Sequence, residues 1–239
     1  STAGSGPGMG INITGRSGVT IKNLNVGQFT YGIYLLNSNN NNFMGNTVAN
    51  NVNGIYLDGS NSNTLSSNNA NSNQNGIFLI RSSSNTLSNN NANSNTDLGI
   101  FLTDSNSNIL SSNNANSNTN FDGIKLQSSQ INNLTGNTAD SNNGNGIFLV
   151  SSGSNMLNDN KANLNNGNGI YMFSASNSNK LNNNNVDSNK GNGIIVEFVS
   201  DNNKLNGNHA SNNKDGIHLL ADSNTMSSNT ISSNSINGI

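Results

Sequence analysis

A Gly-Ile pair recurs along this whole 239-residue chain. It stands at ten positions from Gly32 to Gly238, spaced 22 to 24 residues apart, and Gly10-Ile11 starts the series. A period of this length predicts a stacked array in which each repeat contacts only its neighbours. Such an array grows by adding repeats, so we expect a single domain over 1–239. Residues 1–31 would form an atypical first coil and N-terminal segment, and residues 32–239 the regular repeats.

Three asparagine columns keep fixed distances from an apolar residue later in each repeat. Around Leu65, for example, Asn63 lies two residues before, Asn68 three after and Asn73 eight after. The same registers hold through nine repeats. The amide of Asn both donates and accepts hydrogen bonds, and Asn tolerates left-handed backbone geometry. We therefore predict that each column occupies a corner and forms a ladder along the stack. Members of the three ladders are Asn63, Asn85, Asn108, Asn155; Asn68, Asn90, Asn113, Asn160; and Asn73, Asn95, Asn118, Asn165.

The segments between these corners show the alternation of short strands. In Gly-Ile-Tyr-Leu, the Ile and the residue two later fall on one side, as in Ile77 with Leu79, and we expect them to point inward. The pattern predicts an all-β solenoid of about ten coils, each with three short strands and Asn ladders at its corners. At about 4.8 Å per layer the rod would be roughly 48 Å long. Asn-rich composition is also typical of disorder, but low complexity would not keep three registers through changing repeat lengths.

Three short motifs recur in the repeats. Asn-Gly-Ile-Tyr-Leu, Ser-Asn-Thr-Leu and Asn-Asn-Ala resemble the right-handed parallel β-helix repeats of the NosD-like, pectin-lyase-like family, and look most like Asn-rich surface proteins of methanogenic archaea. The resemblance covers residues 32–239, while residues 18–26 are similar to first coils of that family but lack the three Asn registers. It implies a right-handed parallel β-helix. It implies little about activity, because the superfamily holds lyases, hydrolases, epimerases, tailspikes, and binding or structural proteins.

Composition narrows the possible partners. Nine basic and eleven acidic residues, with no basic run, argue against nucleic acid binding. No apolar run approaches the roughly 20 residues needed to span a bilayer. Cysteine is absent, which removes disulfides and Cys-based metal sites. We expect no metal and no cofactor, and a location outside the cell or at the cell surface.

An outward column lies between the two inward positions of the first strand. Adjacent rings in it would stand one coil apart, within the range in which aromatic pairs attract. Lys125, Ile195 and His218 interrupt or end the column. Ring stacking that merely reinforces the sheet is the simpler interpretation, and contact with another rod, a protein or a polysaccharide is the functional one. The predicted interaction stripe consists of Tyr34, Tyr56, Phe78, Phe101, Phe148, Tyr171 and, from the neighbouring outward position, Phe173.

Catalytic residues are not indicated. The acids are dispersed over different registers, whereas a general acid and base need two carboxylates held close together. The one cluster that sequence alone suggests is Glu197, His218 and Asp222 near the C-terminal end, and surface positions without chemistry are the simpler interpretation. We predict no catalytic residue and no enzyme activity, with a polysaccharide lyase or hydrolase as the minor alternative.

These observations favour a non-catalytic structural β-solenoid of the cell surface or extracellular matrix. The chain stops at Gly238-Ile239, at the start of a coil, and open strand edges invite further addition. Either the chain is part of a longer protein, or it self-associates head-to-tail or laterally into a filament or sheath. The alternative function is a carbohydrate-binding or polysaccharide-modifying β-helix. Binding to ice or mineral is a weaker hypothesis, because no flat Thr array is present.

Overall fold

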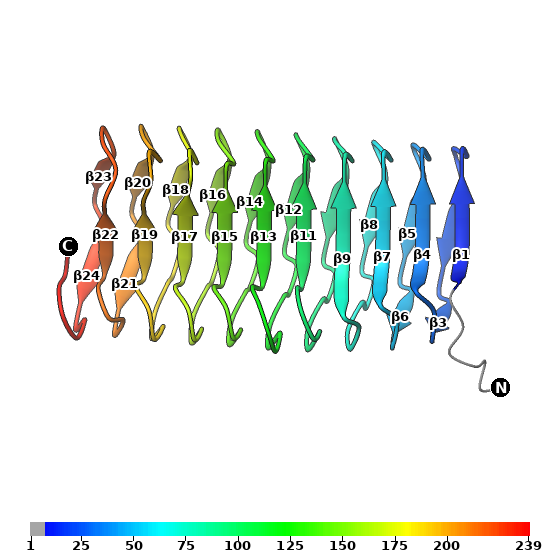
Figure 1. The fold of residues 1–239 in the computed structure, drawn as a ribbon, viewed down its shortest axis with the longest axis horizontal. Helices are drawn as coiled ribbons and strands as arrows, with labels where there is room; N and C mark the ends of the chain where they lie inside the picture. Colours follow the sequence, from blue (N-terminus) through cyan, green and yellow to red (C-terminus); the bar gives the residue numbers. More distant parts are fainter. Residues whose placement is uncertain (1–7) are drawn as a thin grey trace.

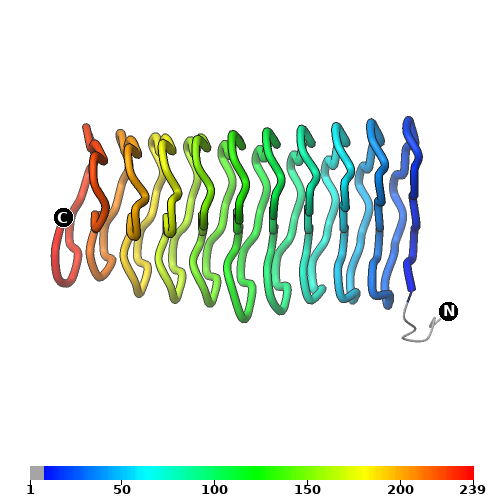
Figure 2. The backbone as a smooth tube through the Cα atoms, turned by 45° about the horizontal axis from the view of Figure 1, so that its top comes forward, coloured from blue at the N-terminus to red at the C-terminus, as the bar shows by residue number. Residues whose placement is uncertain are grey.

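A computed structural model describes residues 8–239 as a straight stack of coils with strands only. Figure 1 shows the coils following one another along the long axis, from the N-terminal β1 to the C-terminal β22 to β24. The tube in Figure 2 shows that every coil has nearly the same outline. All strand pairs are parallel, and each strand pairs with the equivalent strand of the next coil. The predicted all-β parallel solenoid is confirmed.

Two ten-stranded sheets run the length of the rod. The first sheet contains β1 (Met9–Thr14), β4 (Tyr31–Leu36), β7 (Asn53–Asp58), β9 (Asn75–Ile80), β11 (Ile100–Thr103), β13 (Ile124–Gln127), β15 (Ile147–Val150), β17 (Ile170–Phe173), β19 (Ile194–Val196) and β22 (Ile217–Leu219). The second contains β2 (Thr20–Lys22), β5 (Asn42–Met44), β8 (Thr64–Ser66), β10 (Thr86–Ser88), β12 (Ile109–Ser111), β14 (Asn133–Thr135), β16 (Met156–Asn158), β18 (Lys180–Asn182), β20 (Lys204–Asn206) and β23 (Thr225–Ser227).

The third face of the rod lies between the second and third Asn columns. Most coils have no strand there, whereas the sequence predicts three strands in every coil. Paired strands occur there only near the ends, as β3 (Asn25–Gly27) with β6 (Thr47–Ala49) and β21 (His209–Ser211) with β24 (Thr230–Ser232). Between them the pairing shrinks to single bridges, such as Asn69 with Asn91.

The core is a column of side chains that repeats in every coil. In one coil Ile77, Leu79, Leu87 and Ala92 are all fully buried, and the equivalent residues of the other central coils are buried as well. Ala92 lies against Gly76 of the first sheet, and Val48 and Val186 are fully buried at the same position of other coils. Burying one Leu or Ile contributes about 1.5 to 3 kcal/mol, so each coil supplies its own share of the stability.

The three asparagine ladders are confirmed. In the second ladder the Asn90 backbone N–H and Nδ2 both donate to Oδ1 of Asn113, at 3.0 and 2.9 Å. Asn90 Nδ2 also donates to the carbonyl of Leu65, at 2.9 Å, in the preceding coil. All twelve predicted ladder residues donate a backbone N–H to the next Asn of their column. Buried amides therefore satisfy the backbone where the chain bends and cannot form sheet bonds.

The left-handed residue at each corner is not the ladder Asn, as the sequence argument assumed. It is the residue immediately before it: Ser62, Ser67 and Ser72 have φ of 56, 55 and 57°, one step before Asn63, Asn68 and Asn73. Ser, Asn and Gly predominate at these exposed positions. The ladder Asn keeps ordinary backbone geometry because its side chain must point inward along the stack.

A fourth ladder, of serine, was missed by the sequence argument. Each of these Ser residues follows a left-handed residue at the end of the first-sheet strand. Ser105 Oγ accepts the Ser82 backbone N–H at 3.0 Å and donates to the carbonyl of Thr103 at 2.8 Å. The buried members are Ser38, Ser60, Ser82, Ser105, Ser129, Ser152, Ser176 and Ser200. Their constant position, three residues before the first Asn column, was a readable signal.

Candidate functional site

The predicted interaction stripe lies on the outer surface of the first sheet, and its rings contact one another. Tyr34 and Tyr56 stack with centroids 5.7 Å apart, Tyr56 and Phe78 meet edge to face at 4.9 Å, and Phe78 stacks on Phe101 at 4.7 Å. These side chains are half-buried. The strand register causes the contacts, because it places equivalent residues of successive coils directly beside one another.

Lys125 divides the stripe in its middle. It occupies the ring position of its coil, between Phe101 and Phe148 in the strand register. Its Nζ lies 5.4 Å from the centroids of both rings. Two cation–π contacts therefore join the halves of the stripe across the missing ring.

The N-terminal half carries an additional ring and an ion pair. Tyr31 lies 5.0 Å from Tyr34 and 4.9 Å from Tyr56, centroid to centroid. Asp58 occupies the neighbouring outward position in β7 and pairs with Arg81 at 2.6 Å. Thr103 and Gln127 hold the same outward position in later coils, so polar residues are interspersed with apolar ones beside the rings.

The C-terminal half is wider. Phe148 stacks on Tyr171 at 4.9 Å, Tyr171 contacts Phe173 at 5.6 Å, and Phe173 meets Phe198 at 5.0 Å. The Tyr171 hydroxyl donates to Oε2 of Glu197 at 2.7 Å. Phe198 is 64% exposed, so this end presents a broad apolar surface. Sequence reasoning missed Phe198, because it lies in a bend outside the strand alternation.

The hydrogen bond from Tyr171 to Glu197 can be tested by titrating the Tyr171 hydroxyl. Burial, and then the Glu197 carboxylate, raise the pKa of Tyr171 above its ordinary value of 10.0. The carboxylate acts because it accepts a hydrogen bond from the neutral phenol and repels the phenolate. We expect Glu197→Gln to lower the pKa of Tyr171, measured as the tyrosinate absorbance of the variant against the parent protein, with Tyr171→Phe to assign the signal. An unchanged titration would contradict the bond.

The raised pKa of Tyr171 also predicts how the stability of the fold depends on pH. Above pH 10 the unfolded chain ionises Tyr171 while the folded protein retains the proton. The stabilising contribution is therefore complete below the unfolded value and is lost as pH rises toward the folded one.

The suggested cluster of Glu197, His218 and Asp222 does not assemble. Glu197 is bonded to Tyr171, His218 Nδ1 lies 3.8 Å from Oδ2 of Asp215, and the Asp222 backbone N–H donates to Asp201. Within residues 8–239 no group of three or more His, Asp or Glu side chains is arranged to hold a metal ion.

A polar cluster on the third face was not foreseen. Asp187 accepts from His209 Nδ1 at 2.8 Å, and from the backbone N–H and Oγ of Ser211 at 2.8 and 2.9 Å. The serine hydroxyl bonds to the carboxylate and not to the imidazole, so the histidine does not activate it as a base would. Asp187 here takes the place of an Asn in an outer ladder that also includes Asn163.

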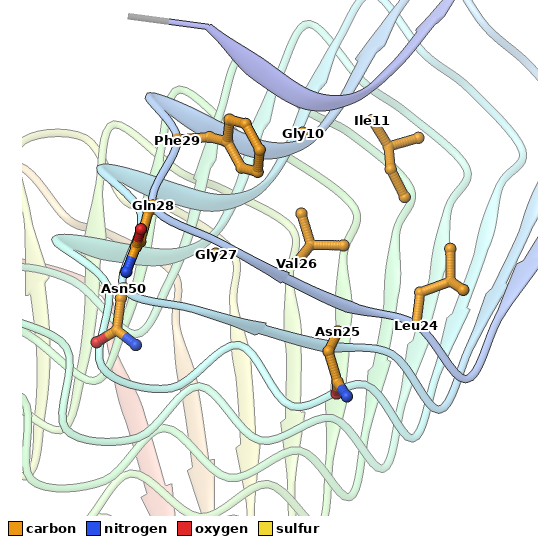
Figure 3. A pocket seen from close by; sticks show the side chains of 9 residues that line it. All are labelled: Gly10, Ile11, Leu24, Asn25, Val26, Gly27, Gln28, Phe29 and Asn50. Atoms are coloured by element: carbon orange, nitrogen blue, oxygen red, sulfur yellow. The ribbon is translucent and has the colours of Figure 1, made fainter. Parts of the chain in front are cut away.

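A hollow opens at the first described coils. Figure 3 shows Phe29, Ile11 and Val26 around it, with Asn25 and Asn50 at its edge. Its lining contains no ionisable side chain, so it offers no acid, base or charged ligand. Elsewhere, no helix among the described residues has the length and apolar character required to cross a membrane.

Solved structures of other proteins share this architecture. The A-module of the mannuronan C-5 epimerase AlgE6 from Azotobacter vinelandii is similar over 90% of this chain and 64% of its own, with a TM-score of 0.84 and 15% identity. The periplasmic alginate epimerase AlgG matches over 90% and 60%, with a TM-score of 0.76 and 18% identity. The catalytic domain of a GH87 α-1,3-glucanase matches over 90% and 50%, with a TM-score of 0.61 and 15% identity. The chain spans about half to two thirds of these structures, and identities this low show a shared right-handed parallel β-helix fold alone.

Sequence models then give the family. A model described as periplasmic copper-binding protein (NosD) matches residues 2–144, and one described as a right-handed β-helix region matches residues 117–239. The chain belongs to the NosD family of β-helix proteins. No curated protein sequence matches it.

Proposed function

We propose that this protein binds an extended polysaccharide along the aromatic stripe, outside the cytoplasm, and does not cleave it. The observation that carries the proposal is the unbroken contact of rings at coil spacing from Tyr31 to Phe101, resumed from Phe148 to Phe198. The stacked rings present one apolar strip to the solvent, against which the apolar face of a sugar packs, and a surface that repeats along an axis suits a polymer better than a small ligand.

The comparisons support this choice over a purely structural role. The solved neighbours include enzymes named for acting on mannuronan, alginate and α-1,3-glucan. The family description and AlgG both carry the word periplasmic, which favours a periplasmic or extracellular location. The acids beside the rings already have partners, Asp58 in Arg81 and Glu197 in the Tyr171 hydroxyl, which favours binding without catalysis.

Copper, named in the family description, does not fit the residues present. Copper sites use thiolate, thioether and imidazole ligands, whereas this chain has no Cys and two His. His209 lies on the third face beside Asp187, and His218 lies on the first sheet near Asp215. Met172 is buried in the core, and the exposed Met9, Met44 and Met156 belong to strands of three different coils.

The proposal predicts that Tyr56→Ala combined with Phe78→Ala weakens polysaccharide binding at least roughly tenfold, because two adjacent stacking surfaces are lost. Binding would be measured on a glycan array and then by calorimetry with the polysaccharides that bind. Thr64→Ala combined with Thr86→Ala, on the outer surface of the second sheet, is the matched control and should leave binding unchanged.

Three results would count against it. Absence of binding to any glycan would refute the function, and binding that survives the double ring variant would refute the site. Release of products from a bound polysaccharide would refute the non-catalytic part. Loss of self-assembly in the ring variant, with no glycan bound by the parent, would instead support lateral association of rods through the same stripe.

A further inference from the structure

Lys125 is the only charged side chain inside the ring column between Tyr34 and Tyr171. The register Phe101, Lys125, Phe148 places its ammonium between two rings that lie one coil to either side. Those rings restrict the Lys side chain from both sides along the rod axis, at 5.4 Å from each centroid. Lys125 is half-buried, so part of its side chain faces the solvent.

No carboxylate among the described residues lies within ion-pair distance of this ammonium. Of the ion pairs found within residues 8–239, none includes Lys125. The acid in its own coil, Asp122, is buried and accepts the backbone N–H and Nδ2 of Asn145 at 2.7 and 2.9 Å. Burial raises the pKa of Asp122 and the charge of Lys125 lowers it slightly, but the two side chains do not form an ion pair. Asp58 is paired with Arg81, and Glu197 accepts from Tyr171 at the far end of the stripe. The centre of the ring surface therefore carries one unpaired positive charge.

Charge also distinguishes this position from the rest of its column. A ring at 125 would continue the stack between Phe101 and Phe148, and most neighbouring coils have one. Gln127 lies exposed two residues further along the same strand face. A neutral sugar gains little from an ammonium that water already solvates, while a carboxylate gains a charge-assisted hydrogen bond.

We infer that the polymer bound by the stripe is acidic, with uronate sugars, and that Lys125 binds a carboxylate of the sugar that lies on the solvent side of Lys125. This inference rests on the proposed function and specifies its ligand class. The rings supply contact with any pyranose face, and Lys125 supplies the preference for an anionic one.

The test compares probes that differ only in charge. Polymannuronate and polygalacturonate are measured against their carboxyl-reduced forms, which have the same backbones with neutral sugars. The parent protein should bind at least one acidic probe roughly threefold to tenfold more tightly than its reduced form, and the preference should fall as salt is raised. Lys125→Met and Lys125→Phe should both abolish the preference while retaining binding to the reduced form.

Lys161→Met is the matched control, because it removes the same charge from an exposed position on the third face. It should keep the preference. Circular dichroism shows whether each variant is folded. Lys125→Phe separates the loss of charge from a loss of packing, because it places at this position the ring that neighbouring coils have.

The outcomes separate the two proposals. Binding that depends on Tyr56 and Phe78 but shows no preference for the acidic probes, or keeps that preference in both Lys125 variants, overturns the inference and leaves the stripe as the binding surface. Failure of all probes to bind, or binding that is indifferent to the ring variant, overturns both.

Discussion

Asn113→Ala is expected to lower the free energy of unfolding by about 3 to 5 kcal/mol, a large loss for the removal of one polar side chain. Four hydrogen bonds end on this amide. Its Oδ1 accepts the backbone N–H and Nδ2 of Asn90, and its Nδ2 donates to the Leu87 carbonyl and to Oδ1 of Asn137. Asn113 is fully buried, so water cannot replace these partners, and each orphaned group carries a desolvation penalty.

The control is the adjacent residue. Asn114→Ala removes one bond, to Asn91 at 2.8 Å, from a half-exposed side chain that water can solvate. We expect a loss of about 1 kcal/mol or less. Urea unfolding would compare the two variants, and hydrogen exchange should show faster opening of the Asn90 amide only in Asn113→Ala. Equal destabilisation by both variants would contradict the ladder as a source of stability.

Gly99→Ala is expected to cost about 3 kcal/mol or more, although it adds a single methyl group. A Cβ at this position would lie 2.6 Å from the Gly123 carbonyl oxygen, 2.8 Å from Asn118 Nδ2 and 2.9 Å from Ala115 Cβ. The carbonyl belongs to the next coil and accepts the Ile100 N–H at 2.9 Å, so relieving the clash would break the sheet register. The repeated Gly is therefore required for close packing of coils.

Gly136→Asn tests the opposite case. Gly136 has a φ of 64° and occupies the left-handed corner that Asn89 and Asn183 occupy in other coils. A Cβ there would approach only Ser112 Oγ, at 3.8 Å. We expect a change within about 1 kcal/mol, measured by the same urea unfolding. A corner variant as damaging as Gly99→Ala would show that loss of glycine itself, and not the coil contact, causes the effect.

The serine ladder and the corner geometry show where sequence reasoning fell short. The sequence argument assigned the left-handed backbone geometry of each corner to the Asn columns. The structure places it at the residue before each Asn. Ser62 takes the strained backbone, while Asn63 takes the inward side chain. Both roles are needed at one bend, and they exclude each other because a single residue cannot satisfy both geometries.

The stripe was partly predictable. Adjacency of Tyr56 and Phe78 follows from strand alternation and a constant register. The bonds of Arg81 to Asp58 and of Tyr171 to Glu197 were not foreseen, because their side chains reach between coils at unequal positions in the repeat. Phe198 joins the stripe only because its coil bends outward, with positive φ at Phe198 and Val199.

Repetition let the sequence alone determine the stacking direction, the buried column and the three amide ladders, because in a solenoid equal positions in the repeat become neighbours in space. Tertiary structure alone decided which outward side chains meet, which corner residue bends and which charge stays unpaired. Those outcomes depend on side-chain rotamers and on local departures from the repeat, and a periodic pattern carries no information about either.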